Sequence, residues 1–127
     1  MLAEVLHPVN FYAGWSLVLL GFLTGAGVGL MFHREDFWGG YGSFRRRLVR
    51  LGHVALVMLG ILNVLFSISV PGSTRQGGAS ILFLFGAVAM PTVCFVTAWR
   101  AGFRNLFFIP VLALVGAVVL ILLGGAL

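Results

Sequence analysis

The sequence has no lysine, three acidic residues and a single cysteine among its 127 residues. Charged residues make up 9% of the chain, against about 25% in an ordinary soluble domain. A surface so poor in charge argues against a water-soluble protein. The lone cysteine, Cys94, excludes an intrachain disulfide and a CxxC motif. No Asp, Glu or Lys falls inside a long apolar run, so the ionisable relay that proton-coupled transport normally needs is missing.

Apolar residues make up 61% of the chain, and they gather in four long stretches. The stretches cover residues 11–32, 48–70, 80–99 and 106–126. Each is close to the about 20 residues that a helix needs to cross a hydrocarbon core of about 30 Å. Backbone polar groups cannot stay unpaired in lipid, so these stretches must be helices. The sequence predicts an all-α integral membrane protein, a single antiparallel four-helix transmembrane bundle over residues 1–127.

Arginine placement predicts the orientation of the bundle. Seven of the eight arginines lie in the first and third connections or at the start of the second span, and only Arg75 lies on the other side. The positive-inside rule then places the first and third connections in the cytoplasm and both termini outside. We expect a cytoplasmic membrane, that of a bacterium. A net charge of +5 would suggest nucleic-acid binding in a soluble protein. Here the arginines separate apolar runs, so no nucleic-acid partner is expected.

Small and polar residues within the spans predict how the helices meet. Gly21, Gly25 and Gly29 recur every four residues and form a doubled GxxxG pattern, which favours close contact with another helix of this chain or of another copy. In the second span, Asn63 and Ser67 belong to a polar stripe. A mid-membrane asparagine is costly unless it is hydrogen-bonded, so we expect this stripe to face the interior.

His33 and His53 are the candidate cofactor ligands. Both lie toward the predicted cytoplasmic ends of adjacent spans, and His33 continues the glycine row. Two imidazoles at similar depth on facing helices could hold a b-type haem. In this the pair resembles the small haem-binding membrane anchors of respiratory complexes, a resemblance that implies an electron-transfer role. The alternative is that both are structural histidines. His33 also stands beside Glu35 and Asp36, which we interpret as a polar patch at the span end rather than a metal site.

A basic cluster opens the second span and contains Arg45, Arg46, Arg47 and Arg50. Each arginine near the membrane surface attracts anionic lipid headgroups by about 1 kcal/mol. The cluster is interpreted first as a topology anchor and second as a docking site for an acidic partner.

These patterns favour a small non-catalytic membrane subunit or scaffold, which packs against itself or against other subunits through the face of Gly21, Gly25 and Gly29. Two alternatives stay open at this point. One is the haem-binding anchor that uses His33 and His53. The other is a homo-oligomeric channel lined by Asn63 and Ser67. No Ser, Thr or Cys has a plausible catalytic base near it in sequence, so an enzyme is not expected.

Overall fold

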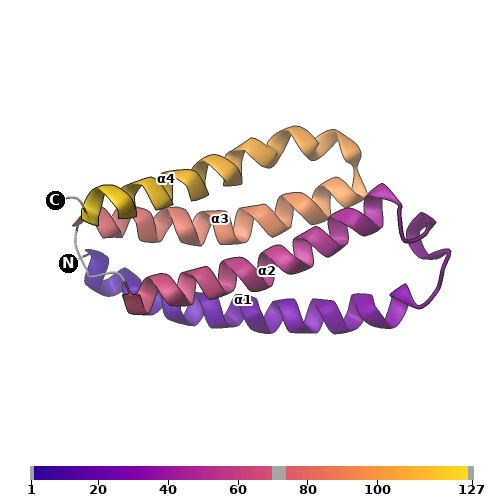
Figure 1. Ribbon diagram of the computed structural model, residues 1–127, viewed down its shortest axis with the longest axis horizontal. Coiled ribbons are helices and arrows are strands. Elements are labelled where there is room, and N and C mark those ends of the chain that lie inside the picture. The colour runs from indigo at the N-terminus through magenta and orange to yellow at the C-terminus, as the bar shows by residue number, and fades with distance from the viewer. Residues whose placement is uncertain (1, 70–73, 126–127) are drawn as a thin grey trace.

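The computed structural model describes residues 2–69 and 74–125, and every regular element in that part of the chain is helical. Two short 3₁₀ helices, η1 and η2, lie in the two connections at one end of the molecule, and the described ends of the chain lie at the other (Figure 1). The elements are α1 (Leu2–Phe32), η1 (Phe37–Gly39), α2 (Phe44–Ser69), α3 (Thr74–Trp99), η2 (Ala101–Phe107) and α4 (Phe108–Gly125).

Four segments are long and apolar enough to cross a membrane, as the hydropathy pattern predicted. They are Pro8–Phe32, Phe44–Ser69, Gly77–Trp99 and Ala101–Gly124. The outer surface of the helices is apolar as well, because many large side chains such as Leu30, Ile68 and Leu122 are at least two-thirds exposed. Soluble monomers seldom expose such continuous apolar surface. The fold is therefore an all-helical arrangement with the composition of an integral membrane protein.

The helices extend beyond the apolar stretches from which they were predicted. α2 begins four residues before the expected start at residue 48, and α3 begins at Thr74 rather than at residue 80. Hydropathy marks the part of a helix that suits lipid, whereas backbone hydrogen bonding continues into the polar flanks. The predicted stretches leave a connection over residues 71–79. Its first three residues lie outside the described part of the chain, and the rest is helical.

The four helices do not close into a ring. α2 packs against α1 and α3, α1 also contacts α3, and α4 packs along α3 (Figure 1). Within the described residues, α4 forms no comparable packing with α1 or α2. Accordingly 39% of the most apolar part of α2 and of α3 is buried, against only 17% of the corresponding part of α1 and of α4. The molecule is a three-helix core with α4 attached at one edge, which leaves one side of α1 and of α4 uncovered.

Glycines allow α1 and α2 to approach backbone to backbone. A Cβ placed on Gly14 would lie 2.5 Å from the carbonyl oxygen of Gly60, and a Cβ on Gly60 would lie 2.7 Å from that of Gly14. Further along the same contact, a Cβ on Gly21 would lie 2.4 Å from Val57 Cγ2. Real Cβ atoms do not approach other atoms so closely, so a larger residue would displace the backbone at Gly14 and Gly60 and the Val57 side chain at Gly21. This is the small-residue packing that replaces the hydrophobic effect between helices in lipid.

The predicted row of Gly21, Gly25 and Gly29 is only partly used, and it is used within one chain. Gly21 and Gly25 face α2, whereas a Cβ on Gly29 would meet nothing within 4 Å. Each four-residue step turns a position about 40° further around a helix of 3.6 residues per turn. Gly29 has therefore rotated out of the α1–α2 contact. The residues that continue this contact are Val28 and Phe32, which pack against Leu48 and Val49.

Candidate functional site

A buried polar cluster joins the three core helices near the end of the molecule opposite η1 and η2. Its members Asn10, Asn63 and Ser80 come from α1, α2 and α3, and each is fully buried. Asn10 Nδ2 donates to Asn63 Oδ1 at 2.7 Å, and the Ser80 hydroxyl donates to Asn10 Oδ1. Asn63 Nδ2 donates to the carbonyls of Leu59, at 2.9 Å, and of Phe83, at 3.4 Å. All three side chains thus have partners inside the chain.

Sequence reasoning singled out Asn63 and missed the other two members of the cluster. Asn10 was placed just outside the first span and Ser80 at the boundary of the third, where polar residues are ordinary. The available signal was that both are small polar residues on segments that could continue as helix. Ser67, the other predicted interior residue, is only partly buried, and its hydroxyl donates to the carbonyl of Val64 in its own helix. The amide of Asn63 is engaged in helix–helix contacts, which favours a structural role over a channel lining.

The structure does not bring His33 and His53 together. The His53 ring lies directly over Gly25, where a Cβ would be 2.5 Å from its Cε1 atom. His33 stands eight residues beyond Gly25, directly after the end of α1, and eight residues of helix span about 12 Å. It is exposed, and its Nδ1 is paired with the carbonyl of Leu30. The geometry favours a packing role for His53 and a helix-end role for His33. Haem binding stays a prediction. Among the described residues, no three His, Cys, Asp or Glu side chains lie close enough together to hold a metal ion.

Arg46 closes the end of α1. It is only 2% exposed, and its Nη2 donates to the carbonyl of Phe32, the last residue of α1, at 2.8 Å. Its Nη1 reaches the carbonyl of Glu35 at 3.4 Å, and the guanidinium lies 4.2 Å from the centre of the Phe32 ring. The last carbonyls of a helix have no partner within the helix, and they carry the negative end of its dipole. Arg46 satisfies one of them, that of Phe32, and also binds the connection that follows the helix.

Arg45, the preceding residue, makes the same kind of contact with α3. Its Nε donates to the carbonyl of Ala98 at 3.0 Å, one residue before the end of that helix at Trp99. Arg50 instead stacks on Tyr41, with its guanidinium 4.0 Å from the ring centre. Arg47 is exposed. In the predicted basic cluster, Arg45 and Arg46 therefore make helix-end contacts, Arg46 and Arg50 make cation–π contacts, and Arg47 is exposed.

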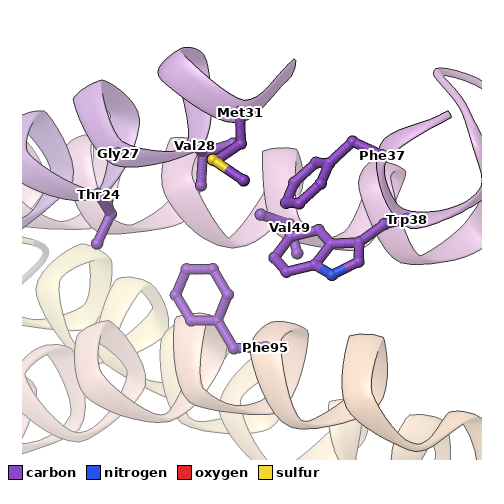
Figure 2. A pocket seen from close by; sticks show the side chains of 8 residues that line it. All are labelled: Thr24, Gly27, Val28, Met31, Phe37, Trp38, Val49 and Phe95. Atoms are coloured by element: carbon purple, nitrogen blue, oxygen red, sulfur yellow. The ribbon is translucent and has the colours of Figure 1, made fainter. Parts of the chain in front are cut away.

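The connection between α1 and α2 is held in an unusual backbone conformation. Trp38 has a φ of 51°, in the left-handed region that residues other than glycine seldom adopt, and Gly39 and Gly40 follow with φ of 86° and 95°. The Trp38 ring stacks on Phe37 with 4.3 Å between centres, and its carbonyl accepts a hydrogen bond from Ser43 Oγ at 2.7 Å. This conformation turns both rings back toward the helices rather than away from them (Figure 2).

The two rings and the three core helices enclose an apolar groove of about 470 Å³, named here the end groove. Phe95 points into it from α3, opposite the rings of the connection (Figure 2). A second hollow of about 190 Å³ adjoins it, because it shares Trp38, Val49 and Phe95 and adds Arg45. The end groove is lined by Thr24, Gly27, Val28, Met31, Phe37, Trp38, Val49 and Phe95. Its lining is almost wholly apolar, so it suits a hydrocarbon rather than a polar substrate.

Comparisons of the chain with known protein families, with curated proteins and with solved structures found no match. The functional reading therefore depends on the arrangement of this chain alone.

Proposed function

We propose that the chain is an integral protein of a cytoplasmic membrane, such as the inner membrane of a bacterium, and serves as a non-catalytic subunit or scaffold of a larger membrane assembly. The observation that carries the proposal is the open arrangement of the helices. α1 and α4 are each covered by other helices on only one side, and their other sides hold large exposed apolar residues. Glycine packing is already used between α1 and α2, so partners would bind at these uncovered sides instead.

The proposed orientation puts the η1 and η2 end in the cytoplasm. This end carries Arg34, Arg45, Arg46, Arg47, Arg50, Arg100 and Arg104. Alkaline phosphatase is active only outside the cytoplasm. A phosphatase fused to the C-terminus should therefore be active. A fluorescent cytoplasmic fusion at the same position, together with an inactive phosphatase fusion, would reverse the assignment.

α4 offers the clearest surface for a partner. Its outer side has a shallow hollow of about 300 Å³ lined by Leu114, Val115, Val118 and Val119. Its segment is also the most hydrophobic of the four. Lipid tails are as apolar as these side chains, so the association of helices there would depend on close fit rather than on removal from water. A bulky substitution at the hollow should disturb that fit.

The test compares Val115→Trp on α4 with Val54→Trp on α2, since these two valines are 55% and 50% exposed. The wild-type protein, purified in mild detergent, should have a protein mass by light scattering well above the 13.6 kDa of one chain. Val115→Trp should lower that mass, and Val54→Trp should leave it unchanged. A wild-type protein that elutes as a single chain without partners would refute the scaffold proposal.

A further inference from the structure

The end groove joins an apolar cavity to a strongly cationic end of the molecule. Seven arginines lie at this end, against the two carboxylates of Glu35 and Asp36. The groove itself has almost no polar lining, because its one hydroxyl, on Thr24, donates to the carbonyl of Gly21 at 3.0 Å. A ligand for this place needs an apolar body and a negatively charged head.

We propose that the end groove binds one acyl chain of an anionic phospholipid, whose headgroup lies beside Arg45. This inference rests on the membrane insertion proposed above. The groove volume of about 470 Å³ lies within the range of about 300 to 1,000 Å³ typical of small-molecule sites. Along α1 it runs from Thr24 to Met31, about 10 Å of helix axis. The acyl chain would pass between Phe95 and the ring of Trp38.

Arg45 is suited to the headgroup because only part of its guanidinium is used by the protein. Its Nε–H donates to Ala98, and within the described residues its two terminal nitrogens have no hydrogen-bond partner. The side chain is exposed, and it borders the hollow that adjoins the end groove at Trp38 and Val49. The planar fork of an arginine fits phosphate oxygens in pairs. The same residue can therefore cap α3 and hold a phosphate.

The left-handed backbone at Trp38 is a second observation at the same place. A bulky residue in this conformation costs free energy, and such strain gathers at binding sites. At this position the strained conformation accompanies an indole that lines the groove. Trp38 would thus form the wall between the acyl chain and the cationic hollow.

Tryptophan fluorescence can test this directly, because the chain has only Trp15, Trp38 and Trp99. In Trp15→Phe/Trp99→Phe, the remaining indole reports on the end groove. In Trp38→Phe/Trp99→Phe, it reports on Trp15, which is 53% exposed near the far end of α1. Both proteins are reconstituted in unbrominated phosphatidylcholine with increasing fractions of brominated phosphatidylglycerol or of brominated phosphatidylcholine. Quenching by bromine measures which lipid lies beside each indole.

The expected result is that Trp38 is quenched more strongly by the brominated anionic lipid than by the neutral one, and that Trp15 is quenched equally by both. In the Trp38 reporter, Arg45→Gln should lower the preference about fivefold, the loss of one surface charge. Gly27→Leu should abolish it, because position 27 opens into the groove. Gly29→Leu is the matched control, since it also has open space around it but lies outside the groove lining.

Equal quenching of Trp38 by the two lipids would overturn the lipid site but would not affect the proposal that the chain is inserted in a membrane. A preference that survives Gly27→Leu would also overturn it, because the anionic lipid would then be held by charge alone outside the groove. A failure of either lipid to quench Trp15 would instead refute membrane insertion, and the lipid site would fall with it.

Discussion

The contact between Gly14 and Gly60 predicts that one substitution will have opposite effects at two positions of α1. Gly14→Ala places a methyl group 2.5 Å from a backbone oxygen and 2.9 Å from the backbone nitrogen of Val64. Neither atom belongs to a flexible side chain, so the helices themselves must separate. Gly29→Ala places the same methyl group in open space. The two variants therefore differ in packing and not in chemistry.

The magnitude follows from the distances. An ordinary Cβ contact begins near 3.4 Å, so α1 and α2 must separate by about 0.9 Å at Gly14. Overpacking of this kind typically costs about 1–3 kcal/mol. One turn away, the same separation would lengthen the 2.7 Å bond between Asn10 and Asn63 to about 3.6 Å, beyond hydrogen-bond range. Such a bond in a membrane protein contributes about 0.6 kcal/mol on average.

Alanine is a better helix former than glycine by about 1 kcal/mol, which offsets part of this loss. The net expectation for Gly14→Ala is a free energy of unfolding lowered by about 0.6–2.6 kcal/mol. Gly29→Ala should raise it by up to about 1 kcal/mol. Reversible unfolding in mixed micelles with increasing dodecyl sulfate, followed by circular dichroism, measures both values. The reasoning is refuted if Gly14→Ala is as stable as Gly29→Ala, because the close backbone approach would then not exist.

Two further predictions concern the polar contacts of α2. Asn63→Leu removes hydrogen bonds to two neighbouring helices and should lower the free energy of unfolding by about 1–2 kcal/mol in the same assay. The control Ser67→Ala removes a bond within one helix and should change the free energy of unfolding by less than about 0.5 kcal/mol. Equal effects would contradict an interhelical role for the amide. Arg46→Lys keeps the charge but loses the fork that reaches several carbonyls, and should cost about 1–2 kcal/mol and speed hydrogen exchange over residues 33–43. The control Arg47→Lys should leave exchange in that connection unchanged, and a similar acceleration in both variants would show that the cap is not specific.

The sequence was sufficient for the number of long apolar helices, although not for the residues at which α2 and α3 begin. Hydropathy is a local property, and a run such as residues 11–32 has no alternative to a helix in lipid. The grouping of arginines in the first and third connections was equally visible, because it requires only the order of the segments. What each arginine contacts was not visible. Arg45 and Arg46 are adjacent in sequence, yet they reach carbonyls 53 and 14 residues away on different helices.

The polar cluster and the helix crossing depend on relations that no local pattern contains. Asn10 and Ser80 are 70 residues apart, and each alone is an ordinary polar residue near a span end. Gly14 was overlooked because Val18 stands between it and Gly21 on the contact face, which breaks the four-residue repeat. A search for alternating three- and four-residue steps would have found it, because that alternation follows the 3.6-residue turn. The same rule explains why Gly29 lies outside the contact between α1 and α2.

The arginine caps also affect the order in which the chain assembles. An α-helix disfavours positive charge in its first turn, and α2 starts with three consecutive arginines after Phe44. Taken alone, this start is electrostatically opposed to helix formation. It becomes favourable when the negative ends of α1 and α3 arrive beside it, since Arg46 and Arg45 each bind one of them. During synthesis the first of these contacts can form as soon as α2 emerges, whereas the second must wait for the end of α3. The beginning of α2 would accordingly have only one of its two contacts in a fragment that stops before Ala98, and it would gain its full order only on completion of α3.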